Sequence, residues 1–467
     1  MSGEIAAKDV FDVAVIGAGV VGCAMARRFV MEGARVLVLE KAADVLDGAS
    51  KGNSAILHTG FDAPPGSLEQ ACIADGYREF LAIRERLGLP LLESGALVLA
   101  WTPAELDELE GLMAKAHANG VSDVRPLTRE QIIVREPNLS AKVQGGFIVP
   151  GEFVIDPWST PHAYLLQALA NGAELRRGAE VLAGEFDGGH WRLSTLQGEV
   201  KADQVIACAG LYGDQMDERF LGQKSFAIKP RKGQFLVFDK AASALASSII
   251  LPVPSETTKG VVICRTVFGN LLVGPTAEEQ ESRVDASTDG ATLNFLLGKG
   301  IEMIPDLAAS EVTAAYAGIR PATEHKDYQI IHDTARHYTS VGGIRSTGLS
   351  AALGIAKYVA ELQTNKTFKK SPMATIAWPK VRFRLSSYDR RDWEEPGHNG
   401  MVCHCELVTR REIEAALEGP MGAASLDGLK RRTRVTMGRC QGFYCQGPLS
   451  KIVEGRFDPP MADNDAA

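Results

Sequence analysis

The 467-residue sequence predicts an α/β fold in three parts: a Rossmann-like dinucleotide-binding domain, an antiparallel-sheet domain and a small, mostly helical C-terminal domain. Three observations predict this fold. A glycine-rich turn joins a short apolar strand to a helix near residue 17. Alternating segments typical of antiparallel strands occur between residues 226 and 276. Four of the eight cysteines fall within the last 65 residues.

The glycine-rich turn has the full context of a dinucleotide-binding unit. Residues 12–16 are an apolar, β-branched run, residues 24–32 have helical composition, and residues 35–39 are a second buried strand. Between the first strand and the helix, Gly17-Ala18-Gly19-Val20-Val21-Gly22 fits G-x-G-x-x-G, and the second strand ends in Glu40. The glycines allow close approach of a pyrophosphate to the helix amides, and Glu40 would accept hydrogen bonds from a ribose diol. FAD and NAD both use this unit, so the turn alone does not choose between them.

Periodicity predicts the remaining elements. Helices are expected over residues 67–87, 102–119, 161–170, 291–303 and 348–363, and strands near 234–238, 261–264, 271–273, 311–317 and 328–332. Thr102 and Glu105 form a capping box at the start of the second of these helices. Residues 365–395 lose periodicity and carry Pro, Lys and Arg, which predicts a linker to a separate C-terminal module.

Composition narrows the function classes. Apolar residues make up 45% and charged residues 23% of the chain, which excludes a disordered protein. A net charge of −8 argues against non-specific nucleic-acid binding. The longest apolar stretch, residues 13–26, is too short for a transmembrane segment, and the N-terminus lacks a signal-peptide pattern. We therefore expect a cytoplasmic protein, either free or peripheral at the inner face of the cell membrane.

Six segments, in order, resemble the D-amino-acid-oxidase superfamily of FAD-dependent oxidoreductases. They are residues 53–60 (NSAILHTG), 154–157 (VIDP), 231–235 (RKGQF), 259–262 (KGVV), 269–277 (GNLLVGPTA) and 317–321 (AGIRP). Within that superfamily the chain most resembles the branch of bacterial glycerol-3-phosphate dehydrogenases and oxidases and L-2-hydroxyglutarate oxidases. Two positions depart from the pattern, because family members often have Gly at Ala55 and Pro at Thr347.

The resemblance implies a discontinuous FAD-binding domain at residues 1–90, 151–225 and 318–370, and a substrate domain at 91–150 and 226–317. The absence of a second G-x-G-x-x-G motif indicates that an organic substrate, not a nicotinamide, reduces the flavin. The resemblance places Asn53, Ser54 and Arg345 at the cofactor. The alternative for Asn53 and Ser54 is ordinary turn chemistry, and for Arg345 it is a salt bridge. The implied cofactor-binding residues are Gly17, Gly19, Val20, Val21, Gly22, Glu40, Lys41, Asn53, Ser54, Val181, Ala209, Gly210, Gly343, Arg345, Gly348 and Leu349.

The same resemblance assigns three catalytic residues. His58 follows the loop that the family places beside the flavin, and it is our candidate general base; the alternative is a structural histidine. Arg320, in the motif that resembles the family's anion clamp, suits a phosphate or carboxylate. Lys259 matches a phosphate-contacting lysine of the glycerol-3-phosphate branch, although a lysine at the start of a strand is usually solvated.

Cys403, Cys405, Cys440 and Cys445 form a C-x-C pair and a C-x4-C pair separated by 34 residues. Four thiolates can hold a [2Fe–2S] cluster or a zinc ion, with free thiols as a third reading. The segment resembles the bacterioferritin-associated-ferredoxin-like [2Fe–2S] domain, which favours iron–sulfur. We therefore expect a linker at 371–397 and an iron–sulfur domain at 398–456. Basic residues at 430–439 would offset the cluster's charge or dock an acidic electron acceptor, unless they are a solvated face.

Together these features predict an FAD-dependent dehydrogenase that oxidises a small anionic secondary alcohol, with glycerol 3-phosphate as first choice. Electrons would pass through a redox-active cluster to an acceptor protein or a membrane quinone system, with or without partner subunits. The cluster could instead be structural. The alternatives are a 2-hydroxy acid such as L-2-hydroxyglutarate, an amino acid or amine, and, in another class, a non-catalytic electron-transfer subunit.

Overall fold

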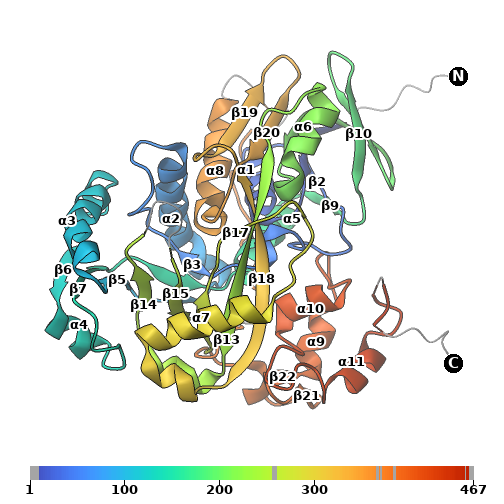
Figure 1. Cartoon of the computed structure of the whole chain (residues 1–467). Coiled ribbons are helices and arrows are strands. Elements are labelled where there is room, and N and C mark those ends of the chain that lie inside the picture. The colour runs from blue at the N-terminus through green and yellow to red at the C-terminus, as the bar shows by residue number, and fades with distance from the viewer. Residues whose placement is uncertain are drawn as a thin grey trace, which may run out of the picture.

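The computed structural model describes residues 10–254, 260–363, 368, 371–381, 385–457 and 459–461. Two large sheets, with their covering helices, form the body of the molecule (Figure 1). The C-terminal residues, red in Figure 1, form a third, smaller unit beside both of them. No helix among the described residues is both long and apolar enough to cross a membrane.

The first sheet has eight strands and carries the glycine-rich turn. At its centre β1 (Val10–Ile16) lies parallel to both β2 (Val36–Leu39) and β12 (Gly198–Ala207). All but the first residue of β1 are buried, because helices cover both faces of the sheet. The remaining strands are β9 (Glu174–Arg176), β10 (Val181–Phe186), β11 (Trp191–Thr195), β19 (Gln329–Asp333) and β20 (Tyr338–Gly342).

Two apolar cores sandwich this sheet. One joins the sheet to four helices: α1 (Val20–Met31), α2 (Leu68–Leu87), α5 (Ser159–Ala170) and α8 (Gly348–Leu362). The other contains Trp191 and packs against α6 (Gly213–Leu221). The Rossmann-like unit predicted from residues 12–40 is therefore confirmed, and the predicted helices at 67–87, 161–170 and 348–363 are its neighbours.

The second sheet has nine strands and is the larger, left-hand part of Figure 1. Its order is β17-β13-β16-β15-β14-β5-β7-β6, with β18 on the other edge of β13. The strands are β5 (Ala96–Ala100), β6 (Arg125–Thr128), β7 (Gly145–Val149), β13 (Ile228–Phe238), β14 (Ile249–Pro252), β15 (Val262–Arg265), β16 (Leu271–Gly274), β17 (Glu278–Glu279) and β18 (Val312–Thr323). Its helices are α3 (Pro103–Ala118), α4 (Arg129–Arg135) and α7 (Gly290–Met303). The Thr102–Glu105 capping box is present at α3.

Two features of this sheet differ from the expectation. The sheet is not purely antiparallel, because β5 and β14 pair in parallel where the two excursions of the chain, near 91–150 and after 226, meet. In addition, β18 continues from residue 312 to 323, so the expected boundary between residues 317 and 318 falls inside one strand. β18 pairs with β13 along its whole length and belongs only to the nine-stranded sheet. A third, small sheet consists of β3 (Ile56–Leu57), β8 (Phe153–Ile155) and β4 (Leu91–Leu92).

The C-terminal unit is small and mostly helical, as expected. It contains β21 (Met401–Cys403), β22 (Val408–Thr409), α9 (Arg410–Ala416), α10 (Leu426–Thr433) and α11 (Gln446–Ile452). Its own apolar core includes Cys403 and Cys445. The described residues of the preceding 371–397 segment lie along the rest of the protein, with backbone hydrogen bonds from Met373 to Met31 and from Ser387 to Val267.

Candidate active site and iron–sulfur site

The turn after β1 is built so that only glycine fits at two of its positions. Gly17 has φ +101°, and a Cβ there would lie 2.5 Å from the carbonyl oxygen of Cys208 at the end of β12. A Cβ on Gly22 would lie 1.9 Å from the carbonyl oxygen of Gly17. The N-cap of α1 is Gly19, which has no capping side chain. The turn therefore brings closely packed backbone to the N-terminus of α1, the position where a pyrophosphate binds such a unit; the Val20 amide there donates to the Ser50 hydroxyl (3.0 Å).

Glu40 closes the other side of this turn. Its carboxylate accepts hydrogen bonds from the amides of Ala18 (2.7 Å) and Ala42 (2.9 Å). Burial raises the pKa of Glu40, while those two amides act in the opposite direction. The neighbouring Lys41 places its ammonium 3.6 Å from the centre of the Tyr212 ring. Glu40 thus lies at the turn, and its contact with a ribose stays a prediction.

A second helix begins at the same place. A Cβ on Gly348, the first residue of α8, would lie 3.9 Å from a methyl group of Val20, the first residue of α1. The N-cap of α8, Thr347, makes no capping hydrogen bond either. Two adjacent helix N-termini concentrate partial positive charge, which fits a dinucleotide diphosphate and an electron-rich ring. The residues present therefore fit FAD.

The other predicted cofactor residues lie around these termini or at the same sheet. Ala209 and Gly210 follow β12, and Gly343 follows β20 with φ +69°. Val181 begins β10. Arg345 pairs with the buried carboxylate of Glu69 at 3.6 Å and donates to the carbonyl of Lys326, as the salt-bridge alternative expects. Their contacts with the cofactor stay predictions.

The two departures from the family pattern have visible local structure. Ala55 has φ +63°, a left-handed conformation that favours glycine, the residue that the family pattern predicts at this position. Thr347 is buried, donates to Glu69 (2.7 Å) and shares a hydrogen bond with Tyr328 (2.6 Å). Proline could make neither bond, so this chain has a polar contact where the family pattern predicts a rigid ring.

The loop at 49–58 lies against β18 of the nine-stranded sheet. The Asn53 carbonyl accepts from the Tyr316 hydroxyl on β18 (2.8 Å). A Cβ on Gly52 would lie 3.0 Å from the Cα of Gly318, so the loop touches the backbone of the same strand. The Asn53 side chain bonds within its own loop, to Ser50 and Ala55, which is the turn chemistry expected as its alternative role. The loop ends at His58, and its contacts therefore hold it against β18, the strand that carries Arg320.

His58 lies at the end of β3 and contacts a carboxylate that the sequence alone did not single out. Its Nδ1 is 2.8 Å from Oε2 of Glu152, which is fully buried between β7 and β8. The other oxygen of Glu152 accepts from the amide and the hydroxyl of Thr59. The signal was available, because Glu152 is the single charge in the apolar run 146–155. His58 and Glu152 together form a base with an oriented ring.

Arg320 is the half-buried cation of the site. Within the described residues its guanidinium makes one hydrogen bond, to the carbonyl of Thr276 (3.2 Å), and no salt bridge. Burial, together with the nearby Arg231, lowers its pKa to about 10, so Arg320 stays charged at neutral pH. The charge of Glu278 acts on Arg320, but the two form no salt bridge, so the half-buried guanidinium can still bind an anionic ligand. Lys259 lies outside the described residues.

The four C-terminal cysteines form two pairs of neighbouring thiols: Cys405 with Cys440, and Cys403 with Cys445. The pKa of Cys440 is lowered because backbone amides, first that of Tyr444, point at its sulfur. Among the described residues, no three His, Cys, Asp or Glu side chains converge as a single metal ion would require. Two thiol pairs with amides directed at sulfur instead fit a dinuclear cluster, in which each iron takes two thiolates.

The basic residues near Cys440 are engaged mainly within the chain, which corrects one of their expected roles. Arg432 makes two hydrogen bonds to Asp44 in the loop after β2, and Arg434 pairs with Glu406 at 2.8 Å. Both arginines are mostly buried and so are not free to dock an acceptor; Arg432 through Asp44, and Arg434 through a hydrogen bond to Asn270 (3.3 Å), hold the C-terminal domain in place. Arg439 remains exposed, although it also pairs with Asp239.

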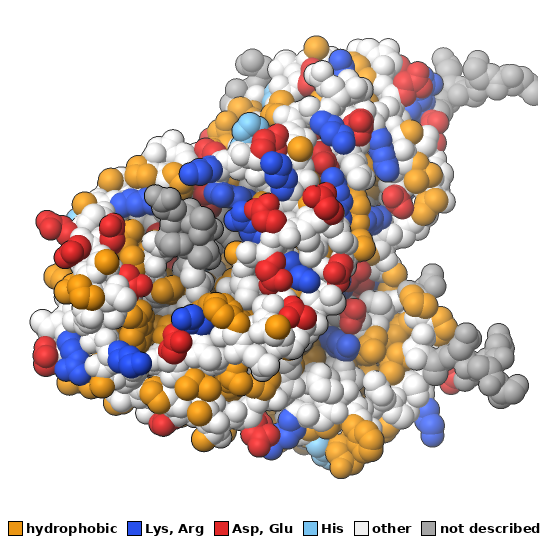
Figure 2. All heavy atoms as spheres, in the orientation of Figure 1, with side chains coloured by type: hydrophobic (Ala, Val, Ile, Leu, Met, Phe, Trp, Pro, Cys, Tyr) orange, Lys and Arg blue, Asp and Glu red, His pale blue; other side chains and the backbone are white. Residues whose placement is uncertain are grey.

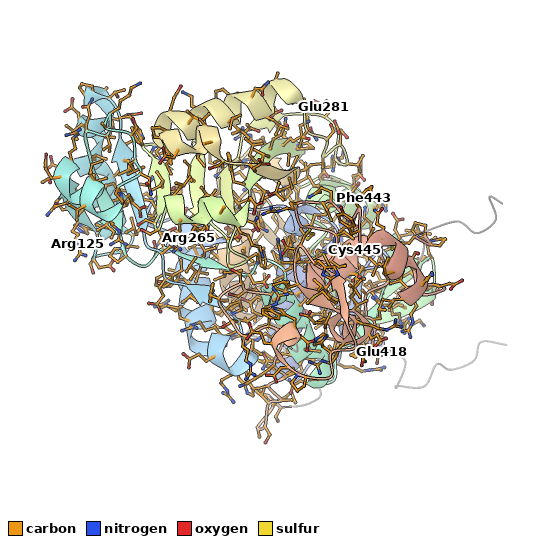
Figure 3. All side chains as sticks on the ribbon, turned by 90° about the horizontal axis from the view of Figure 1, so that it is seen from below. Arg125, Arg265, Glu281, Glu418, Phe443 and Cys445 are labelled. Atoms are coloured by element: carbon orange, nitrogen blue, oxygen red, sulfur yellow. The ribbon has the colours of Figure 1, made fainter. Side chains whose placement is uncertain are left out.

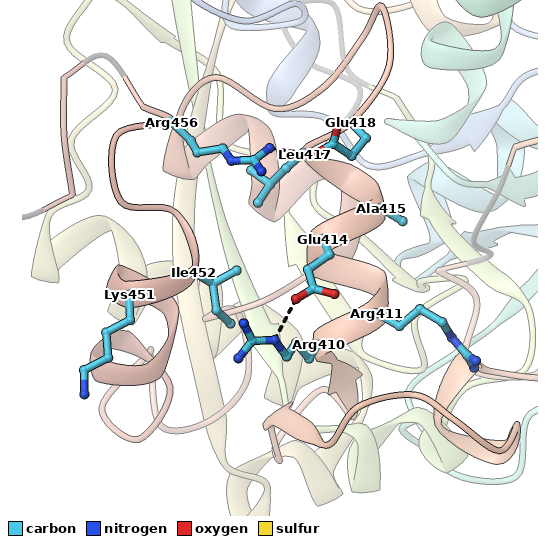
Figure 4. A pocket seen from close by; sticks show the side chains of 9 residues that line it. All are labelled: Arg410, Arg411, Glu414, Ala415, Leu417, Glu418, Lys451, Ile452 and Arg456. Carbon is cyan, nitrogen blue, oxygen red and sulfur yellow. Dashed lines mark hydrogen bonds and ion pairs between the residues drawn. The ribbon is translucent and has the colours of Figure 1, made fainter.

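The surface hollow on the C-terminal domain lies between α9 and α11 (Figure 4). Arg410 pairs there with Glu414 (2.6 Å) and Arg456 with Glu418 (2.7 Å), so most of its charge is neutralised. The acidic and basic side chains are likewise interspersed on the face of the molecule seen in Figure 2. The cysteine loop lies elsewhere on this domain: Phe443 and Cys445 are next to each other in the view from below (Figure 3), and Phe443 is exposed.

Comparisons with known proteins agree with this geometry. Residues 12–362 match the FAD dependent oxidoreductase family, and residues 401–454 match the BFD-like [2Fe-2S] binding domain. A glycerol 3-phosphate dehydrogenase of Caloramator mitchellensis is 33% identical, covering 97% of this chain and 96% of its own. One subunit of the anaerobic glycerol-3-phosphate dehydrogenase of Escherichia coli is 24% identical, covering 96% and 88%.

A solved structure extends the likeness to the fold. The L-α-glycerophosphate oxidase of Mycoplasma pneumoniae, determined with FAD bound, has a TM-score of 0.73 at 26% identity, covering 79% of this chain and 99% of its own. The chain belongs to the FAD-dependent oxidoreductase family. It also carries a C-terminal domain of the BFD-like [2Fe–2S] type, so its cofactors are FAD and an iron–sulfur cluster.

Proposed function

We propose that this protein is an FAD-dependent dehydrogenase that oxidises glycerol 3-phosphate or a related polyol phosphate. One observation carries the proposal: the loop that leads to His58 is held against the strand that carries Arg320. His58 has a buried carboxylate partner, and Arg320 forms no salt bridge among the described residues. A base for a hydroxyl and a cation for an anion are the two groups that this oxidation needs. The relative from Caloramator mitchellensis, which aligns over nearly the whole chain, supports the same substrate.

The roles divide as follows. Arg320 binds the phosphate, and Lys259 is proposed as a second phosphate contact. His58 takes the proton from the hydroxyl at the carbon being oxidised. FAD, when bound, supplies the acceptor for the hydride. The residues of this chain thus bind, orient and deprotonate the substrate.

The C-terminal domain gives the electrons a way out. A [2Fe–2S] cluster carries one electron at a time, so it would pass electrons singly to an acceptor protein or to a membrane quinone system. The Escherichia coli relative is one subunit of its dehydrogenase, which supports partner subunits for this chain as well. We place the protein in the cytoplasm, free or peripheral at the inner face of the cell membrane.

A second substrate class is favoured by the chemistry of Arg320 itself. Its planar guanidinium binds a carboxylate as well as it binds a phosphate. L-2-hydroxyglutarate, or another 2-hydroxy acid, is therefore the second candidate.

Anaerobic reduction of the flavin separates these candidates. The visible absorbance of the purified protein is followed after separate additions of glycerol 3-phosphate and L-2-hydroxyglutarate. Fast bleaching by glycerol 3-phosphate alone is the expected result. Bleaching by the hydroxy acid alone would replace the substrate but keep the roles of His58 and Arg320. Bleaching by neither would contradict the proposed function.

A further inference from the structure

Glu152 is a buried carboxylate whose position needs an explanation. Its side chain is fully buried, and within the described residues no lysine or arginine pairs with it. Burying a charge without a cation is costly unless the group is well hydrogen-bonded. Here the carboxylate accepts from Thr59 at its amide (2.6 Å) and hydroxyl (2.8 Å), and it faces Nδ1 of His58 (2.8 Å). All these contacts converge on the segment that carries His58.

The rest of the segment is held just as firmly. The amide of His58 donates to the hydroxyl of Ser350 on α8 (2.8 Å). On the other side, the hydroxyl of Tyr77 on α2 donates to the carbonyl of Gly151 (2.7 Å), beside Glu152. Burial raises the pKa of Tyr77, so this phenol stays neutral. Among the described residues, Glu152 is thus the charged group in hydrogen-bond contact with the imidazole.

This geometry specifies one tautomer of the imidazole. A carboxylate can only accept, so Nδ1 must carry the hydrogen, and the lone pair is left on Nε2. The His58 side chain retains 19% exposure, so the ring is not sealed off on every side. Such a hydrogen bond from Nδ1 to a carboxylate orients the imidazole in the same way as in other histidine bases that pair with an acidic side chain.

We propose that Glu152 is a positioning residue that holds His58 with its hydrogen on Nδ1 and stabilises the imidazolium formed during the reaction. The inference rests on the proposed role of His58 as the base. When the alcohol is oxidised, the hydroxyl proton passes to Nε2 and the hydride leaves the same carbon for the flavin. The Nδ1 hydrogen stays between His58 and Glu152. Proton and electron pair are then both accounted for.

The test is a double-mutant cycle on the flavin-loaded protein. Glu152→Gln, His58→Asn and the double variant are compared for anaerobic flavin reduction by glycerol 3-phosphate. Glu152→Gln is expected to lower the limiting rate about 10²- to 10⁴-fold, because a glutamine can favour the wrong tautomer. The substrate concentration for half-maximal rate should change little. In the His58→Asn background, Glu152→Gln should have no further effect.

The chain offers a matched control in Glu136. It too is a buried carboxylate, and it accepts hydrogen bonds from Ser247 and Ser248, but it lies at the end of α4, on the edge of the nine-stranded sheet. Glu136→Gln should lower the melting temperature without changing the rate of flavin reduction. Equal slowing by Glu136→Gln, or an undiminished effect of Glu152→Gln in the His58→Asn background, would overturn the inference.

A second measurement is independent of turnover. Diethyl pyrocarbonate modifies an unprotonated imidazole nitrogen, and peptide mass spectrometry measures the extent of modification at His58. Glu152→Gln is expected to lower the rate of modification several-fold, and Glu136→Gln to leave it unchanged.

If Glu152→Gln does not retain flavin, Glu152→Asp keeps the charge and should keep activity within about tenfold of wild type. If His58→Asn itself reduces flavin at the normal rate, the proposed role of His58 as the base fails; if only Glu152→Gln does, this inference alone fails.

Discussion

Segments that are distant in sequence come together at the functional sites of this protein. Arg320 and Gly52 belong to parts of the chain separated by more than half its length, yet the loop of Gly52 touches the strand of Arg320 at Gly318. His58 likewise depends on Glu152. The residue type sets the chemistry of a side chain, whereas its role depends on which partner the fold places next to it.

Arg320 yields the first prediction. Arg320→Lys removes the planar fork, so the dissociation constant for glycerol 3-phosphate should rise about 10- to 100-fold, as expected for the loss of one charge-assisted hydrogen bond. Titration of the flavin spectrum with substrate or an unreactive phosphate analogue measures it. Arg265→Lys, at the end of β15 where the guanidinium bonds to the carbonyl of Ser247, is the control and should bind normally.

Asp214 yields a pH prediction. Burial, the largest single effect, would raise its pKa, but the hydrogen bonds from Arg283 (2.6 and 2.8 Å) and its charge, together with hydrogen bonds from the amides of Ile228 and Gln215, lower the pKa overall. Because the folded value lies below the unfolded value, this pair stabilises the protein above about pH 4 and loses its effect as the pH falls through the lowered value. Asp214→Asn should cost about 2 kcal/mol at neutral pH and progressively less in acid.

Thermal melting of both proteins across a pH series checks this prediction. Asp333→Asn, which breaks a more exposed pair with Arg336, should change stability by less than about 1 kcal/mol. A difference between wild type and Asp214→Asn that grows in acid would contradict the expected direction.

At the scale of elements, the junction of β1, α1 and α8 explains why a short motif predicts so much. Close backbone contacts require glycine at positions 17 and 22, and the side chain of Ile344 crowds the Cβ position of Gly348. Such contacts occur between neighbouring turns and strand ends, so their sequence signal is strong. The pairing of β5 with β14 has no comparable signal, because it joins segments some 150 residues apart.

Gly22→Ala tests this junction. The added Cβ would lie 1.9 Å from the carbonyl oxygen of Gly17, so the turn must open. We expect a loss of stability of about 3 kcal/mol or more and protein purified largely without flavin. Flavin content and melting temperature are the measurements. Gly111→Ala, in α3 with open space around its Cβ position, should instead be neutral or slightly stabilising.

The attachment of the C-terminal domain gives a second prediction at this scale. Asp44→Asn removes the buried charge that Arg432 contacts, at a cost of about 3 kcal/mol. Limited proteolysis of the 371–397 segment should then be about 10²-fold faster, since 1.4 kcal/mol corresponds to a factor of ten. Asp427→Asn, which breaks an exposed pair with Lys430, should leave the cleavage rate within about threefold. Equal cleavage of both variants would show that Asp44 does not hold the domain.

For the whole molecule, the two cofactor sites belong to units that are bonded to each other: the linker is hydrogen-bonded to the body, and Asp44 joins the loop after β2 to α10. The sites nevertheless use separate residues. Cys440→Ser should therefore lower the iron content and the cluster's visible and electron paramagnetic resonance signals while the flavin content stays near wild type. Cys264→Ser, at a buried cysteine of the nine-stranded sheet, should keep its iron. Retention of full iron content by Cys440→Ser would contradict its role as a ligand.

Local sequence patterns were enough to predict the β1–turn–α1 unit, most helices and a four-cysteine site, whereas His58 and Arg320 came from the family resemblance. The local predictions follow from interactions between residues a few positions apart, or from motifs whose spacing reflects one ligand. Other features emerged from the folded chain alone: Glu152 contacts His58, Arg345 pairs with Glu69, Arg432 and Arg434 bond the C-terminal domain to Asp44 and Asn270, and β18 runs unbroken from residue 312 to 323. Each of these depends on contacts between distant segments, which burial and packing select and which no local pattern records.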